Sequence, residues 1–139
     1  MTSSVLALIA VVAALAVATA VGVGVTRRSG ALREVSDTSL ADTSDLGLSR
    51  TGPTIVHFSA VWCGPCASVR RVVKQVCADL PDVAHVEIDM DANPVAARRF
   101  SVLSLPTTFI FDAHGRQRYR SAGVPKHAEL RTALQPLLA

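Results

Sequence analysis

The chain of 139 residues has few aromatic residues, few cysteines and only a small net charge. Aromatic residues make up 4% of the sequence, and there are three cysteines. This composition excludes disulfide-rich secreted frameworks, collagen-like chains and coiled coils. The net charge of +3, with no basic stripe and no aromatic stacking platform, excludes a nucleic-acid partner. The length is sufficient for one hydrophobic core of ordinary size.

Charged side chains are absent from residues 1–26, and the rest of the chain has the composition of an ordinary soluble domain. Val5 to Val25 are Ala, Val, Leu, Ile and Gly, interrupted only by Thr19. A run of about 20 such residues matches the length that a helix needs to cross a hydrocarbon core. The sequence therefore predicts one N-terminal transmembrane helix in residues 1–26.

Cationic residues follow this apolar run directly, at Arg27, Arg28 and Arg33. Such residues tend to remain in the cytoplasm, which predicts a single-pass protein of the cell membrane with its domain on the cytoplasmic side. The alternative is an exported, extracytoplasmic domain. The run Ala18 to Ala20 is similar to a signal-peptide cleavage site, although the positively charged segment that precedes such signals is missing.

The remaining chain divides into a linker and a domain. Residues 27–52 are predicted to be a linker and weak domain edge, with a short strand near 32–36 and a loose helical turn around Leu40, Leu46 and Leu48. Residues 53–139 form the core of the domain, whose full extent starts near residue 31. Strands are predicted at 54–58, 83–89, 107–112 and 117–121, and helices after Cys66, at 94–101 and at 125–138. This order predicts an α/β fold with a central mixed β-sheet flanked by helices.

Two cysteines, Cys63 and Cys66, lie where the first predicted strand passes into the first predicted helix. A C-x-x-C pair in this context is typical of a redox-active dithiol. Unpaired N–H groups and the dipole at the helix N-terminus stabilise a thiolate, so Cys63 is the predicted nucleophile. Cys66, about one turn further on, is the predicted resolving thiol. No second C-x-x-C or H-x-x-x-H completes a zinc site, and we predict no metal.

Two motifs carry a resemblance to a known family. The run Phe58 to Cys66 resembles the active-site signature of the thioredoxin family, and the run Leu105 to Thr108 resembles its cis-proline loop. The resemblance covers roughly residues 31–139 and implies a thioredoxin fold in which Pro106 is cis and the backbone at Leu105 pairs with an extended substrate. The substrate groove that it implies consists of Trp62, Gly64, Pro65, Leu105, Pro106 and Gly123.

The resemblance also implies the activity. It implies a membrane-tethered thiol-disulfide oxidoreductase that acts on protein disulfides, needs no organic cofactor beyond its dithiol, and takes electrons from a thioredoxin-reductase-like or other thiol donor. Gly64 and Pro65 between the cysteines resemble those of reducing members, which favours a protein-disulfide reductase. The alternatives are an exported protein that exchanges disulfides in the cell envelope and a binding module without turnover. Intact Cys63 and Cys66 argue against the binding module.

The sequence departs from the family pattern at two histidines. His57 stands where the family usually has a buried acid, and His85 stands where it usually has the paired lysine. A neutral imidazole can relay a proton, whereas a charged one would stabilise the Cys63 thiolate. We hypothesise that His57 and His85 tune the dithiol; the alternative is that His57 is a satisfied core histidine. Cys77, among apolar neighbours, is expected to be a buried structural thiol.

Overall fold

Five strands form one mixed sheet in the computed structural model, which describes residues 2–36 and 41–139. The strand order is β1-β5-β4-β2-β3. Only the β2–β3 pair is parallel, and the other three pairs are antiparallel. The strands are β1 (Arg33–Glu34), β2 (Thr54–Ser59), β3 (Ala84–Asp89), β4 (Thr107–Phe111) and β5 (Gln117–Ala122). The predicted α/β fold with a mixed sheet is confirmed.

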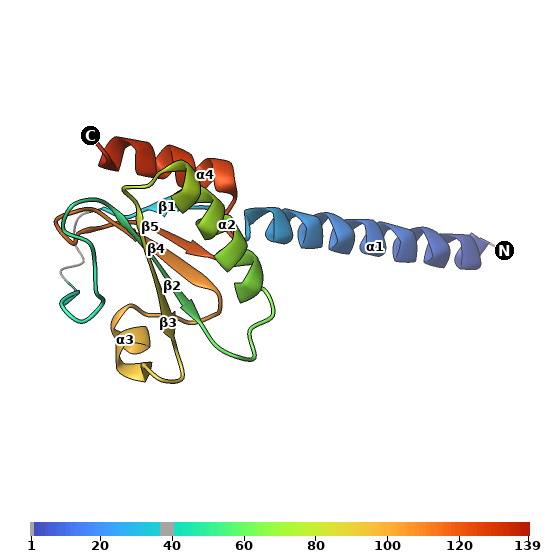
Figure 1. Cartoon of the computed structure of the whole chain (residues 1–139). Coiled ribbons are helices and arrows are strands. Elements are labelled where there is room, and N and C mark those ends of the chain that lie inside the picture. The colour runs from blue at the N-terminus through green and yellow to red at the C-terminus, as the bar shows by residue number, and fades with distance from the viewer. Residues whose placement is uncertain (1, 37–40) are drawn as a thin grey trace.

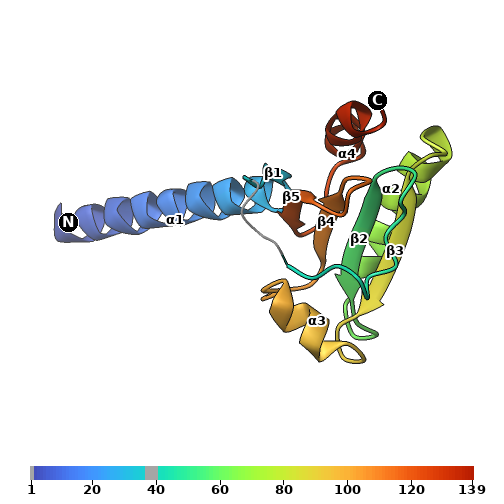
Figure 2. The same cartoon turned by 90° about the vertical axis from the view of Figure 1, so that its left-hand side faces the viewer.

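Helices cover both faces of this sheet (Figures 1 and 2). Helix α2 (Cys66–Asp79) and helix α4 (His127–Leu134), with its short 3-10 extension Gln135–Leu137, lie on one face, and α3 (Pro94–Arg99) lies on the other. Strand β2 lies between β4 and β3, with helices over both faces, and every one of its residues is buried. Parallel strands need a long crossover connection, and α2 provides it between β2 and β3.

Proline marks the boundaries of two helices. The residue before a proline disfavours helical geometry, and α2 accordingly ends at Asp79, just before Leu80 and Pro81. Helix α3 begins with Pro94, whose fixed backbone angle suits the first helical position. These two boundaries fix where β3 begins and where the chain turns after it.

Each face of the sheet has its own apolar core. All four phenylalanines of the sequence lie on the α3 side and contact one another in edge-to-face or tilted pairs, with ring centroids 5.6 to 6.5 Å apart. On the other side, aliphatic side chains of β2 and β4 pack against those of α2 and α4: Ile55, Val69, Val73, Val76, Ile110, Leu130 and Leu134. Helix α2, which carries Cys66, is therefore packed on one face of a sheet whose other face is covered by the phenylalanine core.

The segment between the N-terminal helix and β2 is less regular than predicted. Strand β1 has only two residues, although a further hydrogen bond from Val35 to the Arg118 carbonyl, 2.9 Å, continues its pairing with β5. The predicted turn near Leu46 is present, and the Leu46 side chain is buried in the α3-side core. Leu40, which the prediction included, lies outside the described residues.

The N-terminal helix α1 (Thr2–Arg28) has no buried residues and projects away from the domain (Figures 1 and 2). It is long and apolar enough to cross a membrane by length and composition, a property that signal sequences share. It leaves the domain beside β1 and β5 (Figure 2). The helix thus agrees in position with the predicted apolar segment.

Two glycines form the junction between α1 and the domain. Gly30 and Gly123 have positive φ angles, +86° and +99°, which residues with a side chain rarely adopt. A Cβ atom at Gly30 would overlap the Val124 carbonyl oxygen, and one at Gly123 would overlap the Ser29 hydroxyl. The chain leaving α1 therefore lies against the chain leaving β5 more closely than any larger residue permits.

Candidate active site

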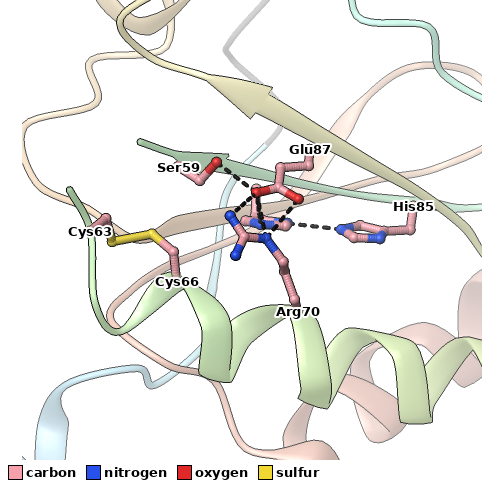
Figure 3. Close-up of polar contacts among 7 residues, drawn as sticks. Ser59, Cys63, Cys66, Arg70, His85 and Glu87 are labelled. Carbon is pink, nitrogen blue, oxygen red and sulfur yellow. Dashed lines mark hydrogen bonds and ion pairs between the residues drawn. A yellow bond between two sulfur atoms is a disulfide. The ribbon is translucent and has the colours of Figure 1, made fainter. Parts of the chain in front are cut away.

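Cys63 and Cys66 form a disulfide at the start of α2 (Figure 3). The turn before the helix is held by a hydrogen bond from the Cys63 N–H to the Ala60 carbonyl, 3.0 Å. Cys66 is fully buried, whereas Cys63 is half-buried and has exposed neighbours on both sides. Of the two sulfur atoms, the one at Cys63 is therefore the more accessible to a partner.

The predicted cis-proline loop lies at the same end of the sheet as the dithiol. The Leu105–Pro106 peptide bond is cis, and β4 starts directly after it, with Thr107 paired to Phe58 near the end of β2. Gly123 donates its N–H to the Pro106 carbonyl, 2.9 Å, and so joins the end of β5 to this loop. The structure thus brings Pro106 and Gly123 together, as the resemblance implies.

Exposed apolar side chains, here called the apolar rim, lie next to Cys63 and in the loop before Pro106. Val61, Trp62 and Leu103 are 94%, 65% and 92% exposed. The Trp62 ring is oriented by a hydrogen bond from its Nε1 to Asp91 Oδ2, 2.9 Å. Large apolar side chains that remain this exposed next to a reactive group are typical of a surface that receives a partner.

The two histidines singled out in the sequence are in direct contact. His57 Nδ1 and His85 Nε2 are 2.8 Å apart, and the rings are stacked with their centroids 4.9 Å apart. His57 is completely buried in β2, and its Nε2 has no hydrogen-bond partner among the described residues. Glu87, its register partner in β3, approaches this nitrogen to 3.5 Å. His57 Nε2 therefore makes no hydrogen bond to a described residue but faces the Glu87 carboxylate.

A carboxylate and a guanidinium cover this histidine pair (Figure 3). Arg70 on α2 makes a two-pronged ion pair with Glu87, at distances of 2.6 to 2.9 Å. Ser59 donates its hydroxyl to the same carboxylate, 2.7 Å. Because Arg70 lies four residues after Cys66, it projects from the same face of α2 as the buried cysteine. The ion pair therefore links the dithiol helix to the strands that carry His57 and His85.

The protonation of these groups follows from their surroundings. Burial lowers the pKa of His57 from 6.5 to about 4, and the neighbouring His85 and Arg70 act in the same direction, against the opposing charge of Glu87. Burial also lowers the pKa of His85. The hydrogen bond from Arg70 is the main cause that lowers the pKa of Glu87 to about 2. At neutral pH the site therefore contains two neutral imidazoles beside a compensated ion pair.

Sequence reasoning identified the histidines but missed Glu87 and Arg70, which it assigned to no site. The available signal was spacing: Arg70 follows Cys66 by one helical turn, and Glu87 follows His85 by two residues in the same strand.

Cys77 is half-buried against the α2–α4 core, and burial raises the pKa of its thiol. Among the described residues, no cluster of His, Cys, Asp or Glu could hold a metal ion.

An oxidisable cysteine pair at a helix start, beside a cis-proline loop on a mixed sheet, defines a protein-disulfide oxidoreductase. The thioredoxin family model matches residues 41–136, and the chain belongs to the thioredoxin family. The thioredoxin fold implied by the sequence is confirmed by similarity to the crystal structure of chloroplastic thioredoxin z, with a TM-score of 0.58 and 31% identity over 63% of this chain and 80% of that one.

Two curated relatives extend this result. Thioredoxin from Mycolicibacterium smegmatis is 44% identical over 80 residues, which cover 55% of this chain and 69% of the relative. The bifunctional thioredoxin reductase/thioredoxin of Mycobacterium leprae is 36% identical over 106 residues, which cover 75% of this chain but only 22% of that protein. The similarity thus reaches only a small part of the bifunctional protein.

The stability of the folded chain is expected to decrease as the pH is lowered from 7 to 5. The folded-state pKa of His57, about 4, lies below its ordinary value of 6.5, so in this range the unfolded chain binds a proton that the folded chain does not. Acid therefore favours unfolding, and His57 accounts for a loss of about 2 kcal/mol over this interval. Urea unfolding of the full chain in detergent micelles, followed by Trp62 fluorescence, measures the loss.

Two variants identify the group responsible. His57→Gln replaces the imidazole by a neutral amide and should remove most of the dependence, leaving the smaller part from His85. His114→Gln, at an exposed turn, should leave it unchanged. Glu87 does not interfere, because its pKa of about 2 and its ordinary value of 4.5 both lie below this range. If His57→Gln still lost the full stability between pH 7 and 5, the assignment of this loss to His57 would be contradicted.

Proposed function

We propose that the protein is a membrane-tethered reductase of protein disulfides. The Cys63 thiolate attacks one sulfur of a substrate disulfide; a Cys63–substrate bond forms while the substrate S–S bond breaks, and the second substrate sulfur leaves as a thiolate that takes up a proton. Cys66, after losing its proton, attacks Cys63, forms the intramolecular disulfide and releases the first substrate sulfur. Two electrons pass from the dithiol to the substrate.

The observation that carries this proposal is the Cys63–Cys66 disulfide at the start of α2, with the outer sulfur accessible and the inner one buried. The cis bond before Pro106 supports the proposed groove, in which the backbone at Leu105 would pair with an extended segment of the substrate and Trp62, Gly64, Pro65 and Gly123 would flank it. The dithiol itself supplies the electrons, so the proposal includes no organic cofactor and no metal.

Two features support the proposed direction of electron flow. Gly64 and Pro65, which lie between the two cysteines, resemble the residues at these positions in reducing members of the family. His57 is neutral at physiological pH because its pKa is about 4, so it adds no positive charge that would stabilise the Cys63 thiolate and make the couple more oxidising. The Cys63–Cys66 disulfide would be reduced again by a thioredoxin-reductase-like or other thiol donor. Its similarity to the bifunctional Mycobacterium leprae protein, whose name joins the two activities, supports a reductase donor.

The midpoint potential of the dithiol tests the direction. Equilibration of the full chain in micelles with dithiothreitol or glutathione buffers, read by the fluorescence of Trp62, the sole tryptophan, should give a two-electron potential of roughly −270 mV. Cys63→Ser should show no redox-linked change in fluorescence. A value near −120 mV, typical of strong oxidants, would contradict the proposed reductase.

We further propose that His57 accepts the proton of Cys66 and passes it to His85. The Nε2 atom of His57 is buried on the face of the sheet that α2 covers, and its Nδ1 contacts His85 Nε2 at 2.8 Å. His85 is exposed and in contact with the buried His57, so it lies between His57 and solvent. Arg70 and Glu87 compensate each other's charge above this pair, which leaves the imidazoles as the groups free to exchange a proton. Both histidines would tune the dithiol in this way.

Substitution of His57 should slow the release of substrate from Cys63 more than the initial attack. His57→Gln removes the proton acceptor and should lower the rate of release about tenfold or more, with a changed profile between pH 5 and 8. His57→Asp restores an acceptor and should recover most of the rate. Stopped-flow measurement of mixed-disulfide decay separates the two steps. Unchanged rate and pH profile in His57→Gln would leave His57 a core residue only.

The membrane part of the proposal rests on α1. Its exposed apolar surface and the cationic residues Arg27, Arg28 and Arg33 after it support a single span of the cell membrane with the domain on the cytoplasmic side. A cytoplasmic position would also give the dithiol access to a thiol donor. An exported domain would instead encounter envelope proteins.

Cysteine labelling in intact bacterial cells tests the sidedness. A membrane-impermeant maleimide should leave Cys63 unlabelled in a Cys66→Ser, Cys77→Ser chain until the cells are permeabilised. The matched control is Ser3→Cys in a chain without the native cysteines, which should be labelled from outside because residue 3 lies at the opposite end of α1. Labelling of Cys63 in intact cells would select the exported alternative.

A further inference from the structure

The end of α1 is hydrogen-bonded to the wall of the proposed substrate groove. Gly30, two residues beyond the last helical residue Arg28, donates its N–H to the Ala122 carbonyl, 2.6 Å. The buried Ser121 hydroxyl donates to the Gly30 carbonyl, 2.7 Å. Gly123, directly after the end of β5, donates its N–H to the Pro106 carbonyl. A continuous path of short hydrogen bonds therefore connects the apolar helix to the cis-proline loop.

This connection contains no flexible linker. Only Ser29 lies between Arg28 and Gly30, and Gly30 and Gly123 lie too close to neighbouring atoms to accept a side chain. The linker predicted for residues 27–52 includes this contact, so its first residues are held against the end of β5. The distance between the membrane span and the groove is therefore set by folded structure.

Cationic side chains lie where α1 leaves the domain. Arg28, Arg33 and Arg120, with one acidic residue, Glu34, line a cavity of about 580 Å³ at this junction. Arg120 is oriented by hydrogen bonds to the carbonyls of Phe100 and Ser101, 2.8 and 2.6 Å. Arginines next to the end of a span interact favourably with lipid phosphates. The side of the domain that faces the junction is thus suited to contact a lipid surface.

The dithiol lies at this same end of the sheet. Strand β2 ends at Ser59, next to the start of β4 and the end of β5, and the loop from β2 to α2 carries Cys63. In Figure 1 this light-green loop lies on the side of the domain from which α1 departs. The same loop carries Val61 and Trp62 of the exposed apolar rim. A span that ends at Arg28 would hold this rim close to the headgroups.

We propose that the dithiol acts at the lipid surface and selects disulfides in membrane proteins whose cysteines lie within a few residues of a membrane span. This inference rests on the proposed reductase function and its membrane tether. The partner segment would lie along the cis-proline loop between the domain and the bilayer. A disulfide far from the membrane would meet the groove only when its own chain reaches back to the lipid surface.

The test uses the full chain, reduced with dithiothreitol, freed of excess reductant and incorporated in vesicles of phosphatidylcholine and phosphatidylglycerol. The substrates are disulfide-linked fluorescent peptides that are lipid-anchored through a short spacer, lipid-anchored through a long spacer, or free in solution. Single-turnover reduction should be about tenfold or more faster for the short spacer than for the long one. Headgroup-attached nitroxide should quench Trp62 strongly.

The matched variant carries about twelve Gly and Ser residues between Thr26 and Arg27, a reach of roughly 20 Å that leaves the Gly30 and Gly123 contacts in place. It should lose the preference for the short spacer and most of the quenching. An unchanged rate with the free peptide shows that the variant is folded and active.

Three results would overturn the proposal in distinguishable ways. Equal rates for both spacers with normal reduction of the free peptide would refute the surface selection while the reductase function stands. A spacer preference and quenching that persist in the insertion variant would refute the role of the fixed junction. No reduction of any peptide would refute the reductase function itself, and this inference with it.

Discussion

The complete burial of β2 is the constraint on which the rest of the structure depends. Helices pack on both faces of this strand, so its polar side chains pair mainly with side chains of the neighbouring strand β3. Ser59 meets the Glu87 carboxylate and His57 meets His85 for this reason. The same burial lowers the pKa of His57, because a charged imidazole there would lose its hydration. The packing of one strand thus determines both the fold and the protonation of the site.

The ion pair between Arg70 and Glu87 reduces the effect of either charge on the protonation of His57 and of the dithiol. A lone carboxylate next to His57 would favour the imidazolium, and a lone guanidinium would favour a thiolate nearby. Bound to each other at 2.6 Å, the two charges largely cancel, although both remain partly exposed to solvent. The site thereby keeps neutral groups at its centre without an uncompensated buried charge.

Local sequence patterns predicted the parts of the fold that local forces determine. The runs rich in β-forming residues gave β2 to β5 to within a residue of their observed ends. The helices predicted at 94–101 and 125–138 are shorter in the structure, Pro94–Arg99 and His127–Leu134. The resemblance to the thioredoxin family added Pro106 and Gly123. The catalytic roles of these residues, and those of His57 and His85, stay predictions.

Other features depend on contacts between distant segments and had no local signal. The sequence placed a short strand near Leu32 but could not assign β1 to the β5 edge, because two residues carry too little pattern to specify a partner. Glu87 read as an ordinary strand residue until the register with His57 was known. The contact of Gly30 with the end of β5 joins residues more than 90 positions apart in the chain.

In the proposed membrane-tethered protein, the glycine junction would also make the domain sensitive to the thickness of the bilayer. The apolar run from Val5 to Val25 is about 30 Å long as a helix, close to the thickness of a typical hydrocarbon core. A thinner bilayer tilts such a helix, and a flexible linker would absorb the tilt. Here the close contact between Gly30 and Gly123 would couple the tilt of α1 to the domain. A change in lipid composition would then change the orientation of the whole domain relative to the membrane.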